Sequence, residues 1–339
     1  MSRPLLFASV VVGVIYIGLM LVLPPEAFFS GDEGIKWLQV DSIRRHWWTS
    51  LAVDAPGEEV DPSHELLPAF LVTSGGAVRS IFPAGYPLVA SFPYAILGTR
   101  GIYLVSGAAA ILCMFVTARL ARLVLQPGNP GRISWADGAG IAAVVATPLV
   151  FYGATIWEHT LAVLLVTAAL IPLTKALGGD ATGWHGAAAG LLLGCAAAVR
   201  TETALIAPAA VAAGLIVAGW KGFGRQAMTL TMGVLVILVP RAYLHRQVFG
   251  SWLPPHLTAN PALQPLLGAY DLLLPVAARG LVTVLLVGSV AFGLMGARLR
   301  WRPPQFALTA AGLSACAIIL GNLLADLVAP LIDPRIKLR

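Results

Sequence analysis

Carboxylates, imidazoles and guanidinium groups gather in a few short turns of an otherwise apolar sequence, and these residues could do chemistry. An acidic pair, Asp32-Glu33, soon follows the first apolar run. Glu158-His159 separates two later runs, and Arg200-Thr201-Glu202 forms the turn of a very apolar hairpin. We expect these turns to meet at one mouth of a helix bundle. Further candidates for substrate binding there are Lys36, Arg79, Tyr86, Arg241, His245, Arg246 and His256.

This set of side chains suits the attack of a hydroxyl group on a sugar carbon that carries a phosphate leaving group. A carboxylate can serve as general base and take the hydroxyl proton. Arginines can hold the phosphate and stabilise the charge that develops on it. The donors of Asp32, Glu33, Glu158 and His159 would also suit a divalent cation, but their spacing does not establish that they meet. We therefore predict no cofactor and no metal.

Purely structural interpretations of these residues remain open. Asp32 could favour the dipole of a helix that begins there, or pair with Lys36 four residues later. Arg200 could pair with Glu202 at the membrane boundary, or extend its charged end to the headgroups. His245, Arg246 and His256 could make ordinary headgroup contacts.

The elements that must position these residues are transmembrane helices. Of the 339 residues, 58% are hydrophobic and only 11% are charged, whereas a soluble domain carries about 25% charged residues. Apolar runs long enough to cross the roughly 30 Å hydrocarbon layer recur from end to end. We predict an all-α bundle of about 9–10 spans in a single membrane domain, 1–339, that ends in a tail at 330–339. The predicted spans are 5–23, 101–125, 138–156, 160–178, 185–200, 203–219, 226–243, 272–296 and 306–329.

Charge patterning predicts the orientation of the bundle. The net charge of +6 comes from short basic clusters between apolar runs rather than from one basic face, which argues against nucleic-acid binding. The positive-inside rule places the N-terminus and the clusters 119–132, 221–225 and 298–302 in the cytoplasm. The acidic loop 24–84 then lies outside, so we expect a multi-pass protein of the cell membrane with an extracytoplasmic site.

The outer loop and the segment after it have their own predicted structure. Residues 34–48 have the pattern of an amphipathic helix in the interface plane, with tryptophans at headgroup depth. Residues 69–82 predict a short β-hairpin around Ser74-Gly75-Gly76. The apolar segment 86–97 is short and proline-rich, and a full crossing would turn the next basic cluster outward. We predict a re-entrant or half-crossing element; a short, tilted span is the alternative.

Several motifs in this order resemble one known family. They are FFSGDEGIKWLQ after the first span, SIFPAGYPLVASFPYAILGTRGIYL before the next, FYGATIWEHTLAVLL and GLLLGCAAAVRTETALIAP. Over residues 5–260 the chain resembles the integral-membrane GT-C glycosyltransferases that use polyprenyl-phosphate sugars, such as protein O-mannosyltransferases and aminoarabinose transferases. The resemblance implies that Asp32 is the catalytic base, with Glu33 beside it. It also implies that Glu158-His159 lines the same cavity and that Arg200 is the basic residue of the matching hairpin.

The resemblance predicts an inverting transferase that moves a sugar from a polyprenyl-phosphate donor to an acceptor that the sequence does not name. A transporter or lipid flippase is the alternative from another class. Such proteins place their sites near the bilayer midplane, often between repeated halves. No internal repeat is visible, and the ionisable residues crowd one face, which favours the enzyme. A third hypothesis is a catalytically silent relative that acts as an assembly scaffold.

Overall fold

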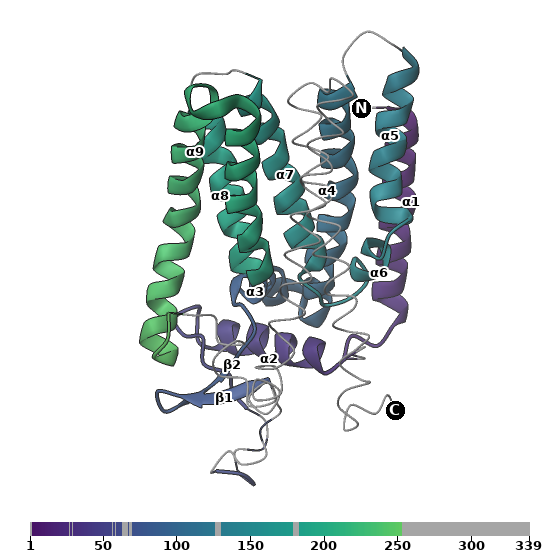
Figure 1. The fold of residues 1–339 in the computed structure, drawn as a ribbon. Coiled ribbons are helices and arrows are strands. Elements are labelled where there is room, and N and C mark those ends of the chain that lie inside the picture. The colour runs from purple at the N-terminus through teal and green to yellow at the C-terminus, as the bar shows by residue number, and fades with distance from the viewer. Residues whose placement is uncertain are drawn as a thin grey trace, which may run out of the picture.

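The computed structural model describes residues 2–252, except 27, 29, 56, 58, 63–66, 68–69, 126–129 and 179–182. The described chain is mostly helical, with one two-stranded sheet. Helices α1, α4, α5, α7, α8 and α9 run side by side, and α2 and the sheet cover the end opposite to the N-terminus (Figure 1). The predicted spans 272–296 and 306–329, the tail and His256 lie outside the described residues.

Long apolar helices form the bundle, and most of them lie where the sequence predicts spans. They are α1 (Arg3–Val22), α4 (Thr99–Leu125), α5 (Pro130–Val145), α7 (His159–Leu177), α8 (Trp184–Val199) and α9 (Ile206–Phe249). Among the described residues, four helical stretches are long and apolar enough to cross a membrane: α1, α4, α7 and α9 with the 3-10 helix η1 (Thr201–Leu205) before it. Apolar side chains of α1 such as Phe7, Val14 and Val22 are exposed, which suits a lipid environment better than water.

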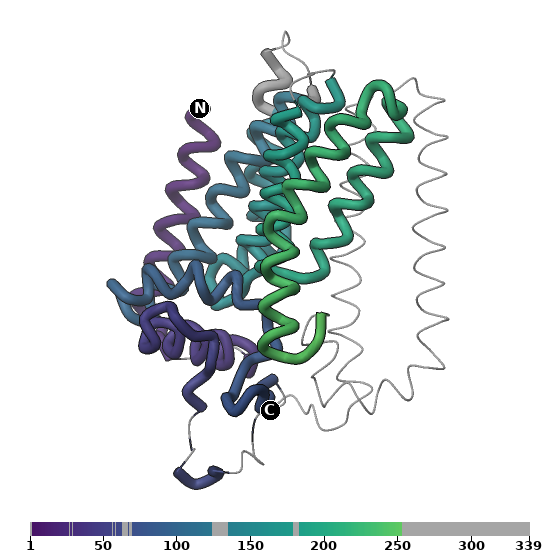
Figure 2. The backbone as a smooth tube through the Cα atoms, turned by 90° about the vertical axis from the view of Figure 1, so that its left-hand side faces the viewer, coloured from purple at the N-terminus to yellow at the C-terminus, as the bar shows by residue number. Residues whose placement is uncertain are grey.

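Helix α9 contains a reversal of the chain, as the separate predicted spans 203–219 and 226–243 require. Gly219 has φ 65° and ψ 174°, a conformation that only glycine adopts readily. The chain turns back at this point (Figure 2). The two arms of α9 pack together just beside this turn. The ring of Phe223 in the second arm lies so close to Gly214 in the first arm that a side chain on Gly214 would clash with it.

The predicted span 138–156 is wrong in its bounds. The helix there, α5, starts earlier and ends at Val145, and a separate short helix, α6 (Leu149–Tyr152), follows. Pro148 explains the break, because a proline disfavours helical backbone in the residue before it. Thr147 supports the new start by accepting a hydrogen bond from the backbone N–H of Leu149 at 3.2 Å.

The acidic loop folds against the end of the bundle. Helix α2 (Gly31–Arg45) starts three residues before the predicted helix, so that Asp32 and Glu33 occupy its first turn. Strands β1 (Leu71–Ser74) and β2 (Ala77–Ser80) form the predicted hairpin. Gly75 and Gly76 both have positive φ, as tight hairpin turns demand. Helix α3 (Gly85–Leu97) has 13 residues, or about 20 Å, which is too short for a full crossing.

Helix α2 differs from the predicted interfacial helix because it has cover on two sides. Val40 packs into a core with Tyr86 of α3, whereas Ile35 packs against the hairpin residues Leu71 and Val78. The polar residues Lys36, Gln39 and Asp41 are buried as well. Trp37 of α2 donates a hydrogen bond to Thr99 of α4, and Trp48, just after α2, donates one to Ser91 of α3, whereas Trp47 is exposed. This double cover holds the first turn of α2 firmly against the bundle.

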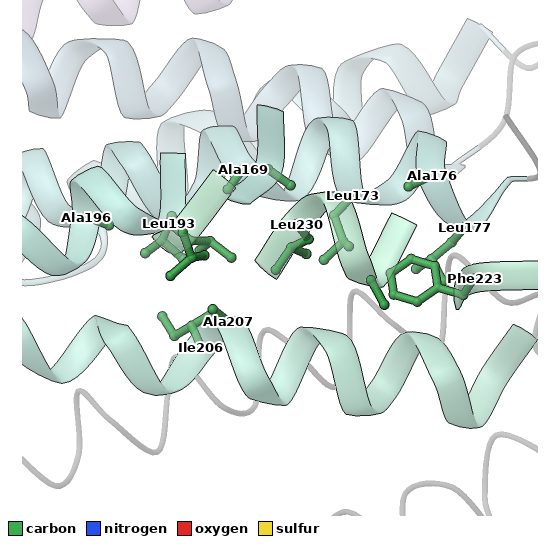
Figure 3. Packing of buried hydrophobic residues seen from close by; sticks show 14 residues of the cluster. Ala169, Leu173, Ala176, Leu177, Leu193, Ala196, Ile206, Ala207, Phe223 and Leu230 are labelled. Atoms are coloured by element: carbon green, nitrogen blue, oxygen red, sulfur yellow. The ribbon is translucent and has the colours of Figure 1, made fainter. Parts of the chain in front are cut away.

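Small residues bring α8 and α9 into close contact. Gly186, Gly190 and Gly194 recur every fourth residue and face the second arm of α9. Such stripes allow helix backbones to approach closely where lipid offers no hydrophobic drive for association. Around this contact lies the largest buried cluster, which includes Leu193 and Leu230 (Figure 3). The packing fixes the end of α8, and Arg200 directly follows that end.

Substitution of Gly190 by alanine should destabilise the protein. A Cβ atom there would lie 2.0 Å from the carbonyl oxygen of Leu230, which is backbone and cannot move aside. We expect a loss of about 1–3 kcal/mol, measured as a lower midpoint of thermal unfolding in detergent. Gly18→Ala is the control, since nothing lies within 4 Å of a Cβ at that position. Equal midpoints for the two variants would contradict the close contact.

Candidate functional site

A buried ion-pair cluster lies where α2, α7 and α8 meet. The Nζ atom of Lys36 lies 2.8 Å from Oε2 of Glu158, and Nη1 of Arg200 donates to Oε1 of Glu158 at 3.3 Å. The side chains of these residues are 4%, 10% and 16% exposed, in the order Lys36, Glu158, Arg200. The structure thus brings together three predicted site residues from distant parts of the sequence.

Further predicted residues surround Arg200. Its Nη1 atom lies 2.5 Å from Nε2 of His159, and its Nε atom lies 3.5 Å from Oε2 of Glu202. Arg241 reaches the same turn, where it donates to the carbonyl oxygen of Ala197 and, at 2.9 Å, to Oγ1 of Thr201. Arg241 therefore orders the turn that carries Arg200 and Glu202.

Aromatic rings enclose the cluster, and the sequence interpretation missed them. The ring of His159 stacks on Tyr152 at 4.4 Å between centroids and lies 5.1 Å from Trp157. The Lys36 ammonium lies 4.8 Å from the centroid of Phe82, in reach of a cation–π interaction. The available signal was the aromatic residues close before Glu158, namely Phe151-Tyr152 and Trp157. These rings keep water from the ion pairs and so strengthen them.

The neighbours of Glu158 control its protonation. Burial alone would raise the pKa of this carboxyl group, but Lys36, His159 and Arg200 outweigh burial and lower the pKa from 4.5 to about 2. Glu158 is thus an anion at any physiological pH. It is held by two cations and is a poor candidate for a base.

Acidification should remove the stabilisation that this anion provides. A carboxyl group whose pKa is lower in the folded state contributes fully above its unfolded pKa, near 4.5. The contribution is lost as the pH falls through the folded pKa of about 2. We expect the difference in thermal midpoint between wild type and Glu158→Gln to shrink from pH 6 to about pH 3. A constant difference across this range would contradict the assignment.

Tyr86 lies behind the cluster and links it to α4. Its hydroxyl group is 2.9 Å from Oγ of Ser106, which donates to the carbonyl oxygen of Trp157 at 3.0 Å. The Tyr86 side chain is buried. The described contacts therefore support a role in placing Glu158 rather than direct contact with a substrate in solution.

An apolar cavity of about 490 Å³ lies between α1 and α4, with the segment around α6 as a further wall. Glu33 contributes to its lining, and residue 33 is only 1% exposed. Asp32 is half-buried and is not among the lining residues. The other lining residues are Gly13, Tyr16, Ile17, Leu19, Met20, Leu23, Pro24, Pro25, Tyr103, Leu104, Gly107, Ala108, Ile111, Phe151, Gly153, Ala154 and Thr155.

Three predicted binding residues make local contacts instead. Arg79 donates to the carbonyl oxygen of Ser74 within its own hairpin at 3.3 Å. Arg246 donates to the backbone of Gly250, and the ring of His245 lies edge-on to Phe249 at 6.2 Å. These contacts give no support for a place in the ion-pair cluster. Within the described part of the chain, no group of three histidine, cysteine or acidic residues could hold a metal ion.

Comparison with family models, curated proteins and solved structures finds no match to this chain. The resemblance to GT-C glycosyltransferases therefore rests on the residues, their order and the arrangement of the apolar runs.

Proposed function

We propose that this chain is a membrane glycosyltransferase that moves a sugar from a polyprenyl-phosphate donor to an acceptor. One observation carries the proposal. Glu33 lines an apolar cavity next to long apolar helices, and the buried cation Lys36, one helical turn further on, meets Arg200 across Glu158. A carboxylate, cations and an apolar cavity are three parts that this reaction requires.

The reaction is a direct displacement at the anomeric carbon. The hydroxyl oxygen of the acceptor bonds to that carbon, and the bond from the carbon to the phosphate oxygen breaks. The polyprenyl phosphate leaves with the electron pair, and the hydroxyl proton passes to a carboxylate in the first turn of α2. Asp32 is the carboxylate that the resemblance favours, and Glu33 is the one that lines the cavity. Attack from the side opposite to the phosphate inverts the anomeric configuration.

Lys36 and Arg200 are the proposed partners of the phosphate. Both contact Glu158, so two cations share one buried carboxylate. Glu202 also lies near Arg200, but its side chain is 41% exposed and solvent screens that pair. Solvent therefore weakens the hold of Glu202 on Arg200, and an anionic leaving group can take the place of this carboxylate.

The charge distribution supports an extracytoplasmic site in a cell membrane. Arg119 and Arg122 lie in the last turns of α4, and Lys221 lies at the turn of α9, at the end of the bundle away from α2. The positive-inside rule places these residues in the cytoplasm and the acidic loop outside.

The test uses purified protein in nanodiscs with a panel of radiolabelled polyprenyl-phosphate sugars and lipid, glycan and peptide acceptors. We expect transfer of label by the wild type and none by the double variant Asp32→Asn/Glu33→Gln, which removes the base in either assignment. Movement of a donor across vesicles without transfer to any acceptor would contradict the proposal in favour of a transporter.

A further inference from the structure

We infer that the cavity between α1 and α4 binds the acceptor, and that this acceptor is a lipid with an uncharged, hydroxyl-bearing head. The inference rests on the proposed function. It concerns a question that the reaction leaves open, namely which of the two substrates enters beside Glu33.

The walls of the cavity suit a hydrocarbon chain. Apolar residues of α1 and α4 supply most of the lining, and the volume of about 490 Å³ falls within the range of small-molecule sites, about 300–1,000 Å³. Ile17 and Leu23 line the cavity and are each 50% exposed, so its apolar rim reaches the surface of the bundle. Because α1 and α4 are long and apolar enough to cross a membrane, that surface faces lipid chains.

The wall of the cavity is also fixed in place. Tyr16 donates from its hydroxyl group to the carbonyl oxygen of Val150 at 3.0 Å. Its ring packs so closely on Gly153 that a Cβ atom there would lie 2.3 Å from the hydroxyl oxygen. This contact joins α1 to the segment around α6. The cavity is therefore a formed space between anchored elements.

Charge decides which lipid fits. Among the described residues that line the cavity, Glu33 carries the only formal charge, and that charge is negative. The described lining holds no lysine, arginine or histidine, so a phosphate in the cavity would be buried in apolar surroundings without a cation to compensate it, which is costly. The cations Lys36 and Arg200 lie in the ion-pair cluster with Glu158 and are not part of the lining. The donor phosphate thus belongs at the cluster, and an uncharged head belongs in the cavity.

A neutral hydroxyl group beside Glu33 is also what the reaction needs. The base must contact the hydroxyl group that attacks, whereas the phosphate must lie on the far side of the sugar carbon. A lipid chain in the cavity would position its head group at the carboxylate with little loss of rotational freedom.

The test compares two photoreactive probes with the same diazirine-bearing chains, a diacylglycerol and the corresponding phosphatidic acid. Full-length protein in nanodiscs is illuminated with each probe, without donor, and the labelled peptides are identified by mass spectrometry. We expect the diacylglycerol to label peptides of α1 and α4 at least about tenfold more than the phosphatidic acid.

Two glycines of α1 provide a matched pair of variants. Gly13 lines the cavity, and a Cβ there meets only Ile111 at an ordinary 3.5 Å, so Gly13→Leu fills the cavity without a backbone clash. Gly18 is not among the lining residues and has nothing within 4 Å. We expect Gly13→Leu to lower diacylglycerol labelling about tenfold and Gly18→Leu to leave it unchanged, with similar thermal midpoints for both.

Photolabelling does not require sugar transfer. The labelling results therefore test the lipid site, and the transfer assay tests the proposed reaction. Equal or stronger labelling by the phosphatidic acid would overturn the inference and assign the cavity to the donor, with the transferase proposal intact. Unchanged labelling in Gly13→Leu would overturn it as well. Absence of sugar transfer with selective diacylglycerol labelling would overturn the proposed reaction and leave the neutral-lipid site standing.

Discussion

Replacement of Glu33 by glutamine should lower the rate of sugar transfer by about 10²–10⁴-fold, the usual contribution of a general base. Glutamine keeps the size of the side chain and its place in the cavity wall, but it cannot take the proton of the attacking hydroxyl group. Asp32→Asn should lower the rate less, because Asp32 is half-buried and does not line the cavity. The measurement is single-turnover transfer with bound donor, which isolates the chemical step.

Two controls make this comparison decisive. Glu33→Asp keeps a carboxylate and should retain more activity than Glu33→Gln, which a purely structural role would not require. Thermal midpoints show whether each variant is folded. If Asp32→Asn abolishes transfer and Glu33→Gln does not, the base is the residue that the family resemblance indicates, and the carboxylate in the cavity has another role.

The regular elements of this fold follow from local sequence. The length of the apolar runs predicted the helices of the bundle, and Gly75-Gly76 predicted the hairpin turn. The separation of 203–219 from 226–243 anticipated the reversal at Gly219. The bounds of the span 138–156 failed because hydropathy stays high across Pro148, although this proline disfavours helical backbone in the residue before it. At Pro148 the backbone restriction of proline predicts the end of the helix better than hydropathy does.

The candidate site was only partly predictable, because its contacts are tertiary. Sequence spacing offered Asp32 as a partner for Lys36, at the favourable separation of four residues on a helix. In the structure Lys36 pairs with Glu158, since the double cover of α2 turns this side chain into the bundle. Glu33 was predicted as a catalytic residue beside Asp32, but nothing in the sequence favoured it as the base. The cavity that distinguishes the two carboxylates is formed by α1, α4 and the α6 segment, which no local pattern brings together.

Lys36→Met should destabilise the protein by about 3–5 kcal/mol, the usual cost of leaving one partner of a buried ion pair behind. Methionine fills the space of the lysine stem but leaves Glu158 with Arg200 as its remaining strong cation. The side chains of Lys36 and Glu158 are 4% and 10% exposed, so water cannot replace the missing ammonium group. Thermal unfolding in nanodiscs measures the loss. Arg45→Met is the control, because the Arg45 side chain is 60% exposed and its partner Asp41 keeps a hydrogen bond from Tyr94.

The double variant Lys36→Met/Glu158→Gln separates the structural role of Lys36 from its proposed role in phosphate binding. When the Lys36 ammonium and the Glu158 carboxylate are both removed, no unpaired charge of this pair stays buried. Most of the stability that Lys36→Met loses should therefore return. Transfer should nevertheless stay at least about tenfold below wild type, because one of the two cations proposed for the leaving phosphate is gone. Recovery of both stability and transfer would mean that Lys36 only neutralises Glu158. In that case Arg200 and the rest of the turn would have to bind the phosphate unaided.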